Sequence, residues 1–439
     1  MTDRRSPRGN GGRSRGAILR SRFLNSLERL DAEERSLLAL IAVRPDVEGE
    51  AIAEAALQAP DFDWDRWLSA AARQWLTAQV AVHVERLPAL RRQVPRTLRE
   101  QLALAQITSR LRVDRFERAL APALRRLQAD GRVLCYLKGA ALLRYAYAAG
   151  ERPINDYDLL VLPQDFAPVC DALEAAGFAM SAGAMAPPGP LTEPRYSTSF
   201  SRDFEGVRLV VALHWELYPS TVGFSFDVRQ LLERARPVPG DYEDTVCALC
   251  PEDTFIHYAT QLPRDSMRKT LLRLADLTAL LGMDGFDPTR LGASAEASGA
   301  TAATYFAVEI CAALGVVVER EPIPSSPVER LRLVQSSCWM LDARWLSERW
   351  TLPHAIELVL SWRLEGALAS PINALRRLRR ELAFVRGHGL GRWLGMVRVG
   401  LPILLAMVLI ALAEGLDRLG LPSLAAALRE RFWRRVEGD

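Results

Sequence analysis

Asp156 and Asp158, one residue apart, are the residues of this sequence best suited to carry out chemistry. Alternate residues of an extended strand point to the same face, so the two carboxylates converge if the backbone is extended here. Two like charges this close are unfavourable unless a cation neutralises them. Carboxylate oxygens suit Mg²⁺, which also keeps places for water and substrate phosphates. We therefore expect both aspartates to be catalytic and to hold Mg²⁺ (or Mn²⁺); a solvated surface turn is the alternative interpretation.

A second candidate lies upstream, at Lys138 and Gly139. The apolar run 133–137 predicts a strand and residues 140–149 predict a helix, so these two residues stand at a strand-to-helix turn. The first N–H groups of a helix can bind a phosphate, and a glycine lets a ligand approach the backbone closely. Arg152 could bind a triphosphate through two parallel hydrogen bonds. We expect Lys138, Gly139 and Arg152 to bind a nucleotide; a plain turn is the alternative.

Together these residues resemble the DNA polymerase beta-like nucleotidyltransferase superfamily, and within it a poorly characterised bacterial nucleotidyltransferase family. The resemblance covers about residues 100–285. The motif positions are Leu137-Lys138-Gly139, Tyr145 or Tyr147, Arg152, Asp156-Tyr157-Asp158-Leu159-Leu160-Val161, Gly177-Phe178, His214-Trp215 and Arg273-Leu274-Ala275-Asp276. The resemblance implies Mg²⁺-dependent transfer of a nucleotidyl group from a nucleoside triphosphate (NTP) to an acceptor hydroxyl.

One position departs from this pattern. The superfamily uses a third carboxylate on a later strand, two positions before the His-Trp pair, and here that position is Ala212. His214 and Glu216 share the predicted strand face with Ala212, so they are the possible third metal ligands. Each step of two residues adds about 6.6 Å along a strand, which puts Glu216 too far away without rearrangement. A packed core histidine is the alternative interpretation of His214.

The surrounding pattern predicts an α+β fold, with a small mixed-sheet nucleotidyltransferase-like core embedded in helical N- and C-terminal regions. Apolar spacings of three and four predict helices at 102–127, 166–176, 252–261 and 266–281. Residues 158–162, a short run closed by Pro163, predict a strand, and alternation predicts strands at 196–204 and 207–213, which are joined as a hairpin. The expected regions are a disordered basic tail (1–16), a helical region (17–130), the α/β core (131–240), a helical region packing on the core (241–330) and a C-terminal helical region (331–439).

Composition narrows the partners. The net charge of +3 over 439 residues does not favour nucleic acid as a partner.

Cys247 and Cys250 form a CxxC pair, but the sequence has no second pair and lacks the strand-to-helix setting of a redox motif. We therefore expect reduced cysteines in a cytoplasmic protein. Arg273 and Asp276, three residues apart on a predicted helix, could be an ordinary surface ion pair. The apolar segment 399–413 is short for a membrane span, so it predicts a buried helix or peripheral contact with the inner face of the membrane.

Three functions remain open from the sequence. The first is a nucleotidyltransferase whose acceptor is a small molecule, a sugar or a protein. The second is a catalytically degenerate nucleotide-binding or scaffold module, because the third carboxylate is missing. The third is a helical interaction protein in which the aspartate pair is accidental.

Overall fold

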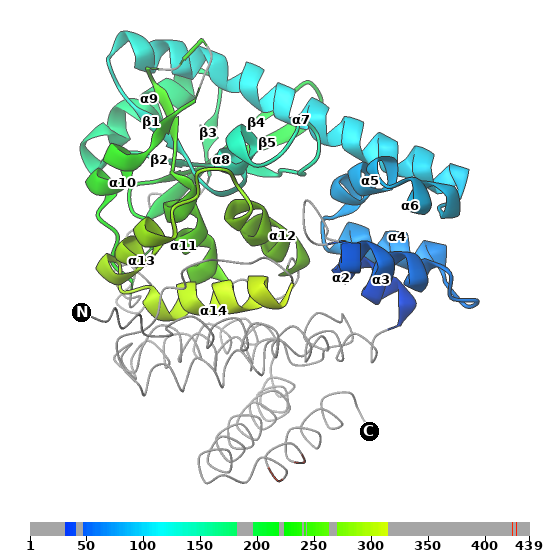
Figure 1. Cartoon of the computed structure of the whole chain (residues 1–439). Coiled ribbons are helices and arrows are strands. Elements are labelled where there is room, and N and C mark those ends of the chain that lie inside the picture. Colours follow the sequence, from blue (N-terminus) through cyan, green and yellow to red (C-terminus); the bar gives the residue numbers. More distant parts are fainter. Residues whose placement is uncertain are drawn as a thin grey trace, which may run out of the picture.

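The computed structural model describes residues 31–40, 47–181, 196–218, 224–238, 241–242, 244–262 and 270–314, together with residues 424 and 427. The expected basic tail, the apolar segment 399–413 and almost all of the expected region 331–439 therefore lie outside the described residues. Figure 1 shows the described chain as a sheet surrounded by helices, with a group of shorter helices to one side. In the described ranges, no helix is both long and apolar enough to cross a membrane.

Within the described residues, six helices precede the sheet. They are α2 (Ala32–Ala39), α3 (Val47–Leu57), α4 (Trp64–Arg73), α5 (Thr77–Arg86), α6 (Pro88–Gln93) and α7 (Arg96–Ala129). The sequence predicted one long helix over 102–127, and α7 begins six residues earlier, directly after Pro95. Proline has no N–H to lose at a helix start, so it fits this boundary. In Figure 1, α7 reaches from the short helices to the sheet.

Seven strands form one mixed sheet in the order β3-β4-β5-β2-β1-β7-β6. They are β1 (Leu134–Tyr136), β2 (Asp156–Leu160), β3 (Ala179–Met180), β4 (Ser197–Phe204), β5 (Val207–His214), β6 (Arg236–Pro237) and β7 (Val246–Ala248). The pairs β2–β5 and β1–β7 are parallel, and the other neighbours are antiparallel. The predicted hairpin joins β4 to β5 through Glu205 and Gly206, which both have positive φ as a tight hairpin turn requires. The mixed sheet among helices confirms the expected α+β class.

Seven further α-helices in the described residues follow β1. They are α8 (Lys138–Tyr145), α9 (Phe166–Ala175), α10 (Val228–Arg234), α11 (Pro251–Gln261), α12 (Thr270–Leu281), α13 (Pro288–Ala297) and α14 (Thr301–Ala313). Strand β7 lies just before α11, so the boundary expected at residue 240 falls inside the sheet. A three-residue apolar strand shows no alternation, and this is why the sequence pattern did not reveal it.

The two faces of the sheet are unlike. One face is apolar and packs against α7 and α9, where the rings of Phe116 and Tyr157 stack with centroids 4.4 Å apart. Burying each such side chain contributes about 1.5–3 kcal/mol. The opposite face carries buried apolar residues only on part of its width, among them Cys135 on β1, Leu160 on β2 and Cys247 on β7. The rest of this second face, along β2, β5 and β4, carries the polar candidate site.

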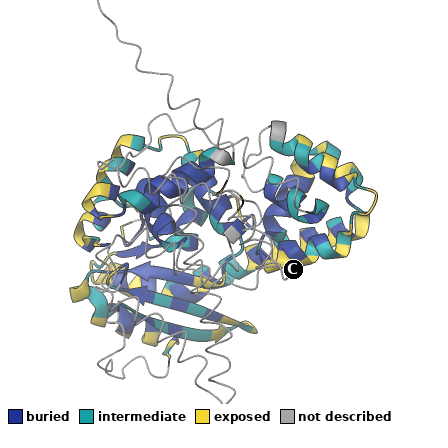
Figure 2. Ribbon diagram, turned by 90° about the horizontal axis from the view of Figure 1, so that it is seen from below, coloured by how far each residue is buried: buried dark blue, intermediate teal, exposed yellow. Residues whose placement is uncertain are grey.

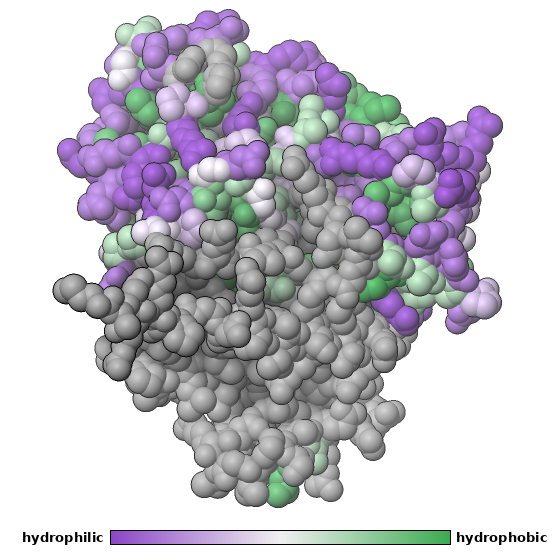
Figure 3. All heavy atoms as spheres, viewed as in Figure 1, coloured by the Kyte–Doolittle hydropathy of each residue, from purple (hydrophilic) through white to green (hydrophobic). Residues whose placement is uncertain are grey.

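A single apolar core joins the helices before the sheet to those after it. It includes Trp67 of α4 and Val80 of α5 together with Leu277 of α12 and Phe306 of α14. Near this core, Gln74 accepts a hydrogen bond from the backbone N–H of Leu271 (3.3 Å). Figure 2 shows the short helices turning buried faces inward and exposed faces outward, and Figure 3 shows a largely hydrophilic surface over the upper described elements. The two helical regions are therefore packed together around common contacts.

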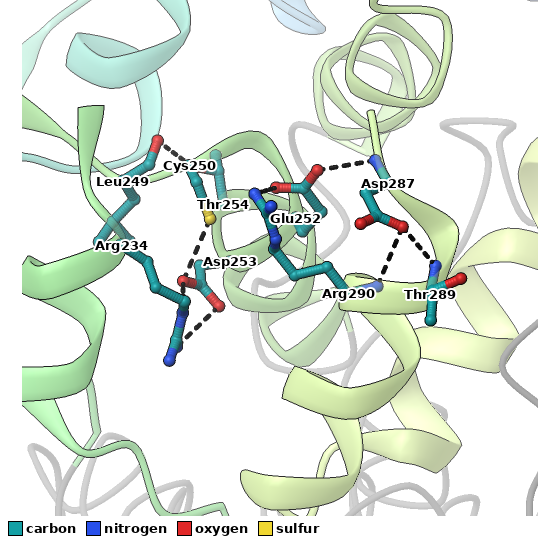
Figure 4. Close-up of polar contacts among 9 residues, drawn as sticks. All are labelled: Arg234, Leu249, Cys250, Glu252, Asp253, Thr254, Asp287, Thr289 and Arg290. Atoms are coloured by element: carbon teal, nitrogen blue, oxygen red, sulfur yellow. Dashed lines mark hydrogen bonds and ion pairs between the residues drawn. The ribbon is translucent and has the colours of Figure 1, made fainter. Parts of the chain in front are cut away.

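The first turn of α11 holds two buried acidic side chains (Figure 4). Asp253 accepts hydrogen bonds from Arg234 Nε (2.9 Å) and from the thiol of Cys250 (3.2 Å). Glu252 accepts from the backbone N–H of Asp287 (2.8 Å) at the start of α13. These carboxylates tie α10, α11 and α13 together, so their role is structural.

The CxxC pair does lie at a strand-to-helix junction, contrary to expectation. Cys247 is on β7, and Cys250 is the residue that precedes α11. Burial, followed by the charge of Asp253, raises the pKa of the Cys250 thiol to about 12. A thiol that stays protonated is a poor nucleophile and a poor metal ligand. All five cysteines in the described ranges are free and buried.

Candidate active site

Asp156 and Asp158 both lie within β2, which begins two residues earlier than the sequence predicted. The extension arises because Asp156 pairs with Val210 on the parallel strand β5. Both aspartates lie on the polar face of the sheet, as the spacing of two residues requires. Asp156 is exposed, whereas Asp158 is only 6% exposed. The pair thus combines a carboxylate that solvent reaches with one held inside the fold.

Asp158 is bound by two nitrogen donors. Its Oδ1 lies 2.9 Å from Lys138 Nζ and 2.9 Å from His214 Nε2. Burial would raise the pKa of Asp158, but the charge of Lys138 and the hydrogen bond from His214 outweigh it and hold this pKa far below its usual range. Asp158 is therefore a carboxylate at neutral pH, with a fixed orientation.

Lys138 reaches Asp158 because of the backbone turn between β1 and α8. Its φ of 48° lies in the left-handed region, which a residue other than glycine rarely adopts. The turn is pinned to β2, since the N–H of Leu137 donates to the carbonyl of Asp158 (2.9 Å). The strained backbone directs the ammonium group back toward the strand that carries the aspartates. Such strain is often retained where function requires it.

Ala212 lies directly beside Asp158. It is the Cα partner of Asp158 on β5, and on its other side it pairs with Ser199 of β4. The position at which the resemblance implies a third carboxylate thus lies next to Asp158 and carries only a methyl group. Two more serines, Ser197 and Ser201, follow on the same face of β4. A row of serines on β4 therefore lies on the same face of the sheet as the aspartate pair, with β5 between them.

His214 and Glu216, considered as possible third ligands, are placed differently from each other. His214 is 5% exposed at the end of β5, and its Nε2 binds Asp158. Glu216 lies beyond the strand and is exposed. The described ranges hold no group of three or more His, Cys, Asp or Glu side chains arranged for a metal.

Arg152, which we expected to bind a nucleotide, is paired with Asp276. Its Nε and Nη2 each donate to an oxygen of Asp276 on α12 at 2.8 Å. Tyr147 donates to the same carboxylate (2.9 Å), and Arg152 and Asp276 are 5% and 0% exposed. The alternative of a surface ion pair between Arg273 and Asp276 is wrong, because Asp276 is buried and paired with Arg152. The sequence could not show this, since the two partners are 124 residues apart.

The absence of a side chain at Gly139 has a structural reason. A Cβ at this position would lie 2.3 Å from Arg152 Nη1 and 3.0 Å from Cζ, well inside van der Waals contact. Gly139 therefore makes room for the guanidinium of Arg152 behind the turn. Of the two charged residues expected to bind a nucleotide, Lys138 has its charged group at Asp158, whereas that of Arg152 is bound to Asp276.

Two residues on α11 and α12 lie near the site, although the sequence did not predict them as site residues. Arg273 on α12 was noted as a motif position and as a possible surface ion-pair partner, and its guanidinium lies 4.8 Å from the ring centre of Tyr258. His257 on α11 was missed altogether and is 1% exposed. Burial first, then the charge of Lys138, lowers the pKa of His257, and Asp158, His214 and Arg273 also act on it. His257 thus lies within electrostatic reach of the site, although a lone histidine in an apolar helix gives no sequence signal.

Comparisons with curated proteins and with solved structures each give no match. A family model described as an uncharacterised nucleotidyltransferase matches residues 60–315, which is more than half of the chain and includes the aspartate pair, Lys138 and Arg273. The chain therefore belongs to this nucleotidyltransferase family.

Proposed function

We propose that this protein transfers a nucleotidyl group from an NTP to an acceptor hydroxyl, with Mg²⁺ (or Mn²⁺) as the cofactor. Membership of the family supports nucleotidyl transfer in general and an NTP as the substrate. The observation that carries the specific proposal is the placement of Asp156 and Asp158 on one strand face with Lys138 bound to Asp158. In this arrangement the carboxylates that would hold a metal ion lie next to the ammonium group of Lys138, which would bind a phosphate.

The two aspartates fit a metal that arrives with its nucleotide. Mg²⁺ is often held by one or two protein carboxylates, with water and substrate phosphates as the other ligands. Asp156 is exposed and Asp158 is ionised, so both would hold such a metal. When bound, the metal would neutralise charge on the phosphoryl group under attack. Two carboxylates are few ligands for a metal ion. We therefore expect the site to bind the metal–NTP complex more tightly than the free metal ion.

The other residues of the site position these groups. His214 fixes the orientation of Asp158, and Lys138 balances its charge until a more negative ligand is present. The serine row beside Ala212 offers hydrogen bonds to a polar acceptor. We infer that the acceptor is a small molecule, a sugar or a protein side chain, because the chain has a net charge of only +3.

The proposal is tested by incubating the purified protein with each α-labelled NTP, Mg²⁺ and candidate acceptors. Pyrophosphate release that disappears in Asp156→Asn and Asp158→Asn is the expected result. Asp130→Asn is the matched control, since Asp130 is an exposed residue at the end of α7. Release that persists in both site variants would overturn the assignment.

The second candidate function is nucleotide binding without turnover. The observation that favours it is Ala212, which leaves the position beside Asp158 without the carboxylate expected there. In that case the protein binds an NTP with either Mg²⁺ or Mn²⁺, and no pyrophosphate is released. Binding and release measured on the same sample distinguish the two functions.

A further inference from the structure

Helix α7 carries a row of exposed apolar side chains. Leu104, Ile107 and Leu111 are 62%, 55% and 46% exposed, and they are three of the five large hydrophobic residues exposed in the described part of the chain. With the exposed Thr108 they occupy positions i, i+3, i+4 and i+7, which lie on one face of a helix. We call these four residues the α7 patch. Exposed apolar side chains gathered in this way are typical of a surface that binds a partner.

The other side of the same helical turns holds the chain that leads to the aspartates. Ser109 Oγ donates to the carbonyl of Arg152 (3.1 Å), and Arg112 Nη2 donates to the carbonyl of Asn155 (3.2 Å). The helix is therefore fixed from behind, and little freedom is lost when a partner covers the α7 patch.

The α7 patch is complementary to a second copy of itself. A twofold axis that passes between Ile107 and Thr108 brings two α7 helices together antiparallel. Each residue then faces the residue that lies equally far along the helix on the other side of the axis. Leu104 of one copy faces Leu111 of the second copy, and Ile107 faces Thr108. Side chains at spacings of three and four interdigitate when two helices cross at a shallow angle, so the apolar residues of both copies become buried.

The charges along α7 favour this antiparallel arrangement. Glu100 faces Arg115 at both ends of the contact, and Arg115 has only a share of the carboxylate of Glu205, which Arg118 also contacts. The charged residues between positions 100 and 115 all face uncharged residues: Arg110 faces Ala105, Arg112 faces Ala103 and Asp114 faces Gln101. A parallel pair of helices would instead place Glu100 against Glu100 and Arg115 against Arg115. Like charges placed opposite each other oppose association.

We propose that this protein forms a homodimer in which the α7 patches of two copies pack antiparallel across a twofold axis. The proposal is independent of the proposed function, because the exposure and the charges of α7 carry it. The contact is small, so we expect a dissociation constant of the order of micromolar. Dimerisation would also restrict the motion of the helix that holds the segment before β2.

Sedimentation equilibrium of the full-length protein measures both the mass and the dissociation constant. The wild type is expected to approach twice the mass of one chain as its concentration rises. Ile107→Lys places a charge at the centre of the contact and is expected to weaken association about a hundredfold or more. Val133→Lys is the matched control, since Val133 is 41% exposed and lies outside α7, and it should keep the wild-type constant. Thermal unfolding checks that both variants fold.

An exchange of charges tests the antiparallel arrangement. Glu100→Arg places two cations opposite each other at both ends of the contact and is expected to weaken association about tenfold. The double variant Glu100→Arg/Arg115→Glu reverses both charges and is expected to recover most of that loss. A double variant that associates no better than Glu100→Arg contradicts the arrangement.

Other occupants of the α7 patch give different results. A wild type with the mass of one chain at every concentration overturns the homodimer. If Ile107→Lys then lowers the unfolding temperature, a segment of the same chain, such as the apolar segment 399–413, covers the patch instead. A dimer that Ile107→Lys leaves intact overturns the location of the contact. None of these measurements involves an NTP, so the failure of this proposal and the failure of the proposed function are distinguishable.

Discussion

Arg152 and Asp276 form a buried ion pair in which two guanidinium nitrogens donate to the two carboxylate oxygens at 2.8 Å each. Burial opposes the charge on Arg152, but the carboxylate of Asp276 outweighs it and raises the pKa of Arg152. The pair joins the segment before β2 to helix α12. It therefore fixes Arg273, on the same helix, relative to the aspartates.

Arg152→Met is expected to lower the free energy of unfolding by about 3–5 kcal/mol, because it leaves the charge of Asp276 buried without its partner. The double variant Arg152→Met/Asp276→Leu is expected to lose less, since neither charge remains. Urea unfolding measures both. Arg96→Met, which breaks an exposed pair with Glu100, is the control and should change little. A double variant less stable than the single one contradicts this account.

Local signals in the sequence predicted much of the fold. Glu205-Gly206 between alternating segments indicated the β4–β5 hairpin, and Gly177 marked the end of α9. These features depend on neighbouring residues, so one sequence is enough to reveal them. The short strands β6 and β7 have two and three residues and were missed, because neither is long enough to show a period.

The candidate site was predictable only where its residues are close in the chain. The i, i+2 spacing of Asp156 and Asp158 fixes their common face whatever the rest of the fold does. The partner of Arg152 and the nearness of His257 to Lys138 depend on how α11 and α12 pack on the sheet. Such tertiary contacts leave no local pattern, so Arg152 was given to the nucleotide and His257 was overlooked.

Ala212→Asp is expected to restore a third carboxylate beside Asp158. Free Mn²⁺ should then bind about tenfold more tightly or better, a change of at least about 1.4 kcal/mol, and pyrophosphate release should rise. Ala212→Asn has nearly the same shape without the charge and is the control. Electron paramagnetic resonance of free Mn²⁺ measures the affinity. Equal affinities in the two variants would show that the position does not face the metal.

Lys138→Met should have opposite effects on the metal and the nucleotide. Removing the ammonium leaves Asp158 with less positive charge nearby, so Mn²⁺ alone binds more tightly. Binding of NTP weakens, because a phosphate ligand is lost. Lys138→Arg keeps the charge and should change both less, and both variants retain the same backbone strain at φ 48°. Weaker binding of Mn²⁺ without nucleotide in Lys138→Met contradicts the expected competition.

Stability should fall as the pH drops from about 6.5 toward 4. Burial, and then the charge of Arg86, lowers the pKa of His83 from 6.5 to about 4. Between these values the unfolded chain takes up a proton that the folded protein does not, which costs about 1.4 kcal/mol per pH unit for each such histidine. His257 acts in the same direction, whereas the stabilisation from Asp158 is lost only below its unfolded value of 3.8.

Urea unfolding of the wild type and of His83→Leu at pH 7, 6 and 5 checks this dependence. The wild type should lose stability steadily over the series, and His83→Leu should lose less. If the free energy of unfolding falls equally steeply with pH in the two proteins, His83 is not a cause of the pH dependence.

The apolar core shared by helices on both sides of the sheet has a consequence for synthesis. Trp67 and Val80 pack in the same core as Leu277 and Phe306, which the ribosome makes about two hundred residues later or more. The first helices therefore leave the ribosome before the partners of their apolar faces exist. Their burial must wait until α12 and α14 have emerged. A nascent chain halted before residue 270 therefore exposes apolar side chains of the first helices to chaperones.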